Sequence, residues 1–279
     1  MTPTPLSPTE PRGPWPRRPF LLLAAALGML LPGTTPLRAE WPYLTEEAST
    51  LAPGRYSLSA GVGRTVQQRA AREAGVLLSP REGTLWALPE LEGTLGVGRR
   101  AEVSIHYQAL YFEPEGSGGS RYGSGDLRLW TKLGVVAGET HGGALRFGFK
   151  VPSASDADGL GTDEADVYLQ ALWDVALGPA LLSANGGLAI LGDPARNRSQ
   201  DDVLTWGAAL RGPLWRGLRG GGEAAGQSGP FGVGRKRDFF TLGAVLGWHA
   251  PGWRIDLAGR RGLGDARNWG WLAGFTHER

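Results

Sequence analysis

Residues 122–175 read YGSGDLRLWTKLGVVAGETHGGALRFGFKVPSASDADGLGTDEADVYLQALWDV and contain three segments in which apolar and polar side chains alternate. The segments cover 127–135, 145–151 and 165–175. In the second segment, Phe147 and Phe149 point one way and Arg146 points the other, and this period of two predicts β-strands with one apolar and one polar face. A short connection separates the first two segments, whereas the connection over 152–164 is long, acidic and rich in Gly and Ser.

The chain from Gly54 onward repeats this arrangement, which predicts about twelve strands in all. The other strands are expected near 54–62, 85–97, 101–111, 180–191, 202–211, 214–227, 240–248, 253–260 and 269–275. Short turns, such as the one expected at Gly212-Pro213, follow the even strands. Long polar loops, such as 113–125, follow the odd strands.

An even number of strands, alternating loop lengths and both termini on the side of the short turns are typical of a bacterial outer-membrane barrel. A soluble β-sandwich would alternate too, but its packing does not enforce unequal loops. We therefore predict an all-β fold, an antiparallel transmembrane barrel of about twelve strands with lipid outside and a polar lumen. Aromatic residues near strand ends would form interface girdles, with core packing as the alternative for any one of them: Tyr56, Trp86, Tyr107, Tyr111, Trp173, Trp248, Trp253, Trp269 and Trp271.

Composition excludes several classes of protein. A net charge of +2, with no clustered basic stripe, argues against nucleic acid as a partner. The absence of cysteine excludes a disulfide framework, a thiolate metal site and a cysteine nucleophile. The high counts of 45 glycines and 11 tryptophans suit closely packed strands with aromatic belts.

The N-terminal region predicts export. Arg17 and Arg18 precede a short apolar run over 20–31, and a small residue, Ala39, stands where a signal peptidase cuts. We interpret 1–39 as a signal peptide, with a buried helix or an uncleaved anchor as the alternative. Residues 40–53 have no clear period and are interpreted as a periplasmic lead-in or a small plug, and 54–279 as the barrel. The predicted location is the outer membrane of a Gram-negative bacterium.

Four motifs resemble a known family, the outer-membrane transporters named after the meta-pathway of phenol degradation. They are Thr45–Leu51 before Pro53-Gly54-Arg55-Tyr56; Gly125-Asp126-Leu127 leading to Lys132-Leu133; Lys150-Val151-Pro152 with Asp156, Asp158, Gly159–Thr162 and Asp166; and Arg260–Leu263 with Asp265 and Trp269-Gly270. The resemblance covers roughly 44–277 and implies an outer-membrane barrel with a transport role. It brings no catalytic residues.

The chain departs from the pattern of such barrels at its end. They usually finish on an aromatic residue that the barrel-assembly machinery reads, whereas this sequence continues from Phe275 to Arg279. We expect the assembly machinery to be a partner and to use Phe275 instead, or to assemble the chain less efficiently.

The polar face of the strands supplies a mixed set of charges that we assign to the lumen. Isolated charges in a narrow barrel are unfavourable, so these groups should be paired or hydrated. They would either select solutes during passage or form a salt-bridged network that fills the barrel. A channel predicts a continuous lumen, and a structural barrel a plugged one. The predicted lumen or selectivity residues are Glu90, Glu92, Glu102, His106, Asp126, Arg128, Lys132, Arg146, Lys150, Asp166, Asp174, Arg254 and Asp256, with Arg211, Glu223 and Arg260 in the wider set.

The loop over 152–164 contains a weaker candidate site. Its acidic residues Asp156, Asp158, Asp163 and Glu164 surround glycines and offer oxygen ligands of the kind that Ca²⁺ prefers. Their spacing is not that of an EF-hand, and a solvated acidic loop is the simpler interpretation, so we predict no resident metal and no cofactor.

Catalysis finds little support in the sequence. Ser104 and His106 share a strand face, as a hydrolase would need, but spacing of two on a strand does not make a nucleophile–base pair. No GxSxG elbow is present, and we assign no catalytic residues.

The predicted function is passive passage or uptake of a small solute of aromatic or hydrophobic character. The expected partners are outer-membrane lipid, the assembly machinery and the solute itself. The main alternative is a plugged structural or adhesin-like barrel without transport. An outer-membrane lipid hydrolase is the less favoured alternative.

Overall fold

The computed structural model describes residues 41–67, 72–73, 76–77, 82–116, 118–192, 200–229, 238–264 and 268–279. The predicted signal peptide lies outside the described residues. Within them, no helix has the length and apolar character needed to cross a membrane.

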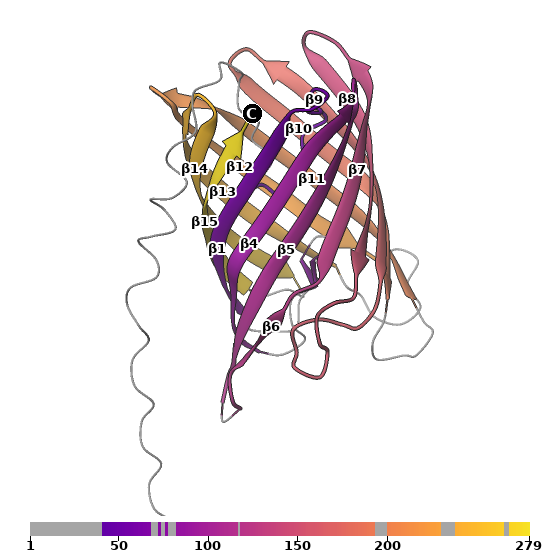
Figure 1. Ribbon diagram of the computed structural model, residues 1–279, viewed down its shortest axis with the longest axis vertical. Helices are drawn as coiled ribbons and strands as arrows, with labels where there is room; N and C mark the ends of the chain where they lie inside the picture. Colours follow the sequence, from indigo (N-terminus) through magenta and orange to yellow (C-terminus); the bar gives the residue numbers. More distant parts are fainter. Residues whose placement is uncertain are drawn as a thin grey trace, which may run out of the picture. The chain divides into compact units, whose positions relative to one another are not determined.

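Twelve long strands in the described residues form one closed antiparallel barrel (Figure 1). They are β1 (Tyr56–Gln67), β4 (Gly83–Gly98), β5 (Ala101–Pro114), β7 (Leu127–Ala137), β8 (His141–Val151), β9 (Asp166–Leu177), β10 (Ala180–Gly192), β11 (Gln200–Trp215), β12 (Leu218–Ser228), β13 (Phe239–Ala250), β14 (Trp253–Gly264) and β15 (Asn268–Glu278). Each pairs with its sequence neighbours, and β1 closes the ring by pairing with both β4 and β15. The predicted fold class is confirmed.

Three short strands lie outside this count. Among the described residues, β2 (Arg72–Glu73) and β3 (Val76–Leu77) form a separate pair. β6 (Arg121–Ser124) pairs with β5 beyond the point where β7 leaves it. The loop predicted over 113–125 is therefore partly strand, because β5 itself continues to Pro114.

Short turns gather at one end of the barrel with the C-terminus, which is marked at the upper end in Figure 1. Gly178 and Gly252 adopt positive φ values of 61° and 79° in two of these turns, a conformation that favours glycine. The turn predicted at Gly212-Pro213 is wrong, because β11 runs on to Trp215 and the chain turns at 216–217. Pro213 sits beside a register irregularity near the strand's end, where a missing amide is tolerated.

The barrel is apolar outside and polar inside, as the alternation predicts. Phe147 and Leu169 are 48% and 51% exposed, whereas Lys150 and Asp166 are 1% and 2% exposed. Such an outward apolar band is unfavourable in water and is the expected surface of a barrel in lipid.

Several predicted girdle aromatics also face outward. Trp173, Trp248 and Trp269 are among the exposed large side chains, which is the placement of a girdle and not of a core. At the turn-side end, Trp253 packs edge-on against Trp248 and stacks on Phe275.

Candidate functional site

Residues 41–53, called here the plug segment, run inside the barrel. Trp41, Thr45, Ala48 and Leu51 are buried, although no strand of the wall contains them. The segment leaves the lumen at the end with the short turns, where the amide of Gly54 donates to a wall carbonyl at 2.8 Å. The described contacts of this segment are with the wall of the lumen.

Carboxylates of the wall hold the backbone of the plug segment. The amides of Leu44 and Thr45 donate to Oε2 of Glu223 at 2.8 and 3.0 Å. The amide of Ala48 donates to Oδ2 of Asp174 at 2.8 Å, and that of Leu51 donates to Oε2 of Glu102 at 2.5 Å. Hydrogen bonds to a charged acceptor are stronger than neutral ones, so these acids fix the path of a segment that has no regular structure.

Cations of the wall hold the carboxylates of the plug segment. Lys132 Nζ lies 3.3 Å from Glu46, and Arg146 lies 3.2 Å from the same carboxylate. Arg211 pairs with Glu47 at 2.9 Å.

Wall cations also hold carbonyls of the plug segment. Lys132 donates to the carbonyl of Glu47 at 3.1 Å, and Arg211 to that of Thr45 at 3.3 Å. Arg254 donates to the carbonyl of Trp41 at 2.6 Å, and Arg260 donates to that of Pro42. The lumen charges are therefore largely engaged by the chain's own N-terminal segment.

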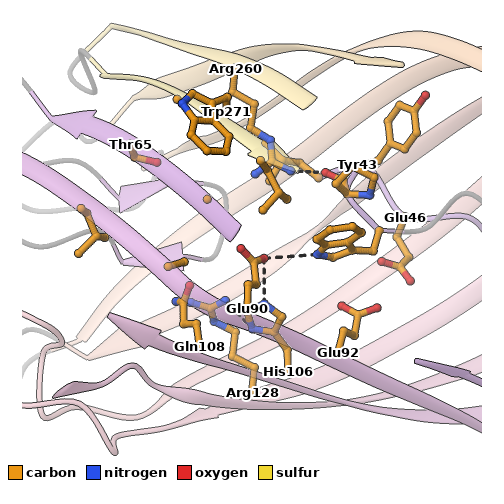
Figure 2. Close-up of a pocket in the computed structure, with 18 of the residues that line it drawn as sticks. Tyr43, Glu46, Thr65, Glu90, Glu92, His106, Gln108, Arg128, Arg260 and Trp271 are labelled. Atoms are coloured by element: carbon orange, nitrogen blue, oxygen red, sulfur yellow. Dashed lines mark hydrogen bonds and ion pairs between the residues drawn. The ribbon is translucent and has the colours of Figure 1, made fainter. Parts of the chain in front are cut away.

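A cavity of about 180 Å³ lies beside the plug segment (Figure 2). Its lining includes Trp41, Glu90, His106, Arg128 and Trp271. Glu90 Oε1 accepts from the indole of Trp41 at 3.4 Å and lies 3.1 Å from Nε2 of His106. The cavity thus combines aromatic walls with a short polar chain.

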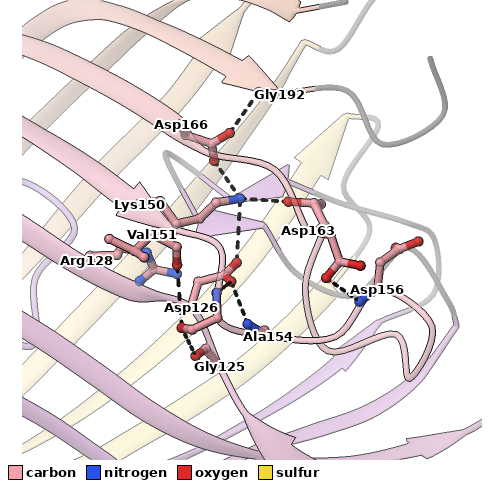
Figure 3. A network of polar contacts seen from close by, with 12 residues as sticks. Gly125, Asp126, Arg128, Lys150, Val151, Ala154, Asp156, Asp163, Asp166 and Gly192 are labelled. Atoms are coloured by element: carbon pink, nitrogen blue, oxygen red, sulfur yellow. Dashed lines mark hydrogen bonds and ion pairs between the residues drawn. The ribbon is translucent and has the colours of Figure 1, made fainter. Parts of the chain in front are cut away.

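A buried network anchors the loop over 152–165 (Figure 3). Lys150 Nζ lies 2.9 Å from Asp166 and 3.5 Å from Asp126, and it donates to Thr162 Oγ1 at 2.8 Å. Asp126 Oδ1 in turn accepts from the amides of residues 153 and 154. The loop is therefore tied to the wall at its base.

The same loop folds into the mouth of the barrel. Ala154 and Leu160 are buried in one apolar cluster with Leu85 and Phe112 of the wall. Leu85 also lines the cavity. The cavity therefore lies between the plug segment and the apolar cluster in which this loop packs against the wall.

All thirteen predicted lumen side chains are buried or line the cavity, whereas their role in selectivity remains a prediction. Lys132 pairs with its cross-strand neighbour Glu102 at 2.8 Å. Arg146 lies opposite Lys132 on β8, and both cations also reach Glu46 of the plug segment. Glu46 and Glu47 are not among the predicted lumen residues, because the segment that contains them has no periodicity; their signals were an acidic pair and a place in the Thr45–Leu51 motif.

The weaker candidates are not drawn together. Asp163 Oδ1 accepts from the amide of Asp156 at 3.1 Å, and the part of the chain that the structure describes contains no cluster of three or more acidic or histidine residues able to hold a metal. Ser104 Oγ accepts from Thr94 Oγ1 at 2.9 Å, while His106 turns to Glu90.

Comparison with solved structures agrees with the fold. An outer-membrane channel from Pseudomonas putida is 14% identical, with a TM-score of 0.60, and the match covers 83% of this chain and 98% of that one. The translocator domain of the autotransporter NalP from Neisseria meningitidis is 14% identical, covers 81% and 89%, and has a TM-score of 0.49. The β domain of the Bordetella autotransporter BrkA is 13% identical, covers 81% and 99%, and has a TM-score of 0.44.

The first of these neighbours belongs to the phenol meta-pathway family, so the chain resembles that family in its motifs and in its fold. No family model matches the chain, and no curated protein matches it.

Proposed function

We propose that this chain is an outer-membrane channel for the passive passage of small solutes, closed at rest by its own plug segment. The observation that carries the proposal is the nature of the plug contacts. Many of them are hydrogen bonds and ion pairs between the plug segment and a polar wall, which water can replace when the segment moves. Among the described residues, apolar packing of the segment is confined to small clusters around Trp41 and Ala48. Outer-membrane barrels among its structural neighbours support the location.

A structural barrel is the second candidate, and the same plug segment favours it. A lumen filled by charge-paired chain would stiffen the wall and need never open. The two functions differ in one respect: a channel has a path that becomes available when the plug segment leaves, whereas a structural barrel collapses or stays closed.

Single-channel recording in planar bilayers separates the two. We expect small or rare conductance steps from the chain beginning at residue 40, and larger, longer-lived steps when the plug segment, residues 41–53, is deleted. Because deletion leaves lumen charges unpaired, Glu47→Gln serves as a milder variant that removes only the ion pair with Arg211. Heat-modifiable migration in gels identifies folded barrels, and Glu139→Gln in an exposed turn is the matched control.

Silence of both folded plug variants would refute the channel and leave the structural barrel. Larger steps from the deletion variant and intermediate behaviour from Glu47→Gln would support passage through the space that the plug segment occupies.

A further inference from the structure

Arg128 carries a charge that no carboxylate in the described residues neutralises directly. Its side chain is 6% exposed, lines the cavity, and has an Nε without a hydrogen-bond partner. Its described polar contact is Nη1 to Nδ1 of His106 at 3.4 Å. Because Nε2 of that ring faces Glu90, the network assigns the proton to Nε2 and leaves Nδ1 as the acceptor.

The acids near Arg128 are engaged elsewhere. Asp126, two residues earlier on the same face, accepts two loop amides and pairs with Lys150. Glu90 is held by His106 and Trp41. The residue opposite Arg128 on β8 is Lys150, a second cation. A buried guanidinium in such surroundings is unfavourable unless an anion reaches it.

The cavity limits what that anion can be. Trp41, Trp271 and Leu272 give it apolar walls, and its volume of about 180 Å³ suits a molecule with one ring. Space for one water is roughly 10–15 Å³ on the same measure, so the cavity exceeds a chloride or water site many times over. The carboxylates Glu46, Glu90 and Glu92 line it together with Arg128, Arg146 and Arg260, so the lining offers no excess of positive charge to a multiply charged anion.

We propose that this cavity binds a small monocarboxylate with an apolar, ring-sized body, whose carboxylate pairs with Arg128. The inference rests on the proposed channel function and names the class of solute for which the lumen provides a stopping place. A guanidinium presents parallel N–H groups that match a carboxylate in two-point contact, and the tryptophan walls take the ring. Figure 2 shows Arg128 and Trp271 among the side chains that surround the cavity.

Binding of benzoate and of neutral benzamide, compared by isothermal titration calorimetry in detergent, tests the proposal. The two probes have nearly the same shape, so the ratio of their dissociation constants reports the contribution of the carboxylate. We expect benzoate to bind on the order of tenfold more tightly to the unaltered chain, and Arg128→Gln to bring the ratio to about one. Arg128→Lys keeps the charge and should retain part of the preference.

Arg121→Gln is the matched control, since Arg121 lies outside the cavity lining and its side chain donates to a loop carbonyl, that of Asp158. Equal binding of the two probes by the unaltered chain, or an unchanged preference in a folded Arg128→Gln barrel, would overturn the proposal. If Arg128→Gln does not fold, a full preference in Arg128→Lys would overturn it, because the two-point contact is then absent.

The outcomes also separate this site from the channel. A barrel that conducts without preferring benzoate refutes the carboxylate site and leaves the channel standing. A barrel that binds benzoate at Arg128 but stays silent in bilayers after plug deletion refutes the channel and leaves a binding barrel.

Discussion

Glu223→Gln should weaken the docking of the plug segment. The contact of Glu223 with the wall is a long one, 4.0 Å from Oε1 to Nε of Arg260, so the main loss falls on the plug segment. The carboxylate of Glu223 lies in the lumen and accepts from two consecutive amides of the plug segment. A hydrogen bond to a charged acceptor contributes about 1.5–3 kcal/mol net. Glutamine keeps the shape and can retain one weaker hydrogen bond. We therefore expect the free energy of docking of the plug segment to weaken by about 1.5–3 kcal/mol in all.

Cysteine labelling measures this loss directly, because the chain has no cysteine of its own. Thr45→Cys places a thiol at a fully buried position, and the hydroxyl that it replaces has no hydrogen-bond partner. When the segment recloses faster than the reagent reacts, the labelling rate follows the open fraction. A factor of ten corresponds to about 1.4 kcal/mol, so Glu223→Gln should raise the rate on the order of ten- to a hundredfold.

Two controls complete this experiment. Ser49→Cys lies at an exposed position of the plug segment and should react quickly in every background. Glu139→Gln, in a turn outside the lumen, should leave the rate at position 45 unchanged. A loss of about 1.4 kcal/mol implies a rate about tenfold higher. If Glu223→Gln changes the labelling rate of Thr45→Cys by less than about twofold, this carboxylate does not hold the plug segment.

Three further predictions concern the wall, the exterior and the plug segment. Lys150→Met leaves two buried carboxylates without their cation, so the free energy of unfolding of the barrel should fall by about 3–5 kcal/mol. The heat-induced shift in gel migration should then occur at a lower temperature, and an unchanged shift temperature would contradict the network. Leu169 faces lipid, so Leu169→Arg should lower the stability of the barrel in liposomes, measured by urea titration, by about 2–4 kcal/mol. Gln170 faces the lumen, so Gln170→Arg should lower the stability by less. Burial raises the pKa of Tyr43 from 10.0 to about 12, so its contribution to docking is complete below pH 10 and is lost as the pH rises toward 12. The absorbance titration of the unaltered chain minus that of Tyr43→Phe should therefore show one phenol ionising near pH 12, and ionisation near pH 10 would place Tyr43 in water.

The wall could be predicted because its physics is local. A strand in lipid must alternate, so the outward position of Leu145 and the inward position of Arg146 follow from their order in the chain. Errors appear where that local signal weakens. The end of β11 was misplaced because Pro213 signals a turn, whereas a register irregularity accommodates it within the strand.

The pairing between the wall and the plug segment could not be predicted because it depends on residues far apart in sequence. Inward position follows from alternation, but the partner of Arg211 depends on which acid the plug segment brings past it, and Glu47 lies 164 residues away. The plug segment has no period of its own, since its backbone bonds to side chains of the wall and not to a neighbouring strand. Its acidic pair is meaningful only once the cations of the wall are known.

The distribution of charge inside the barrel relates the closed state to the proposed binding site. Wall acids bind amides of the plug segment and wall bases bind its carboxylates, so these lumen charges lose a partner when the segment leaves. Other pairs, such as Lys150 with Asp166, lie within the wall and do not depend on the segment. Withdrawal would expose many paired charges at once, which favours return of the segment or its replacement by water and solute. Arg128 differs, because it lacks a direct counter-charge among the described residues even when the plug segment is docked. A solute that supplies that charge can therefore bind beside a closed plug, and occupancy of the cavity need not wait for the lumen to open.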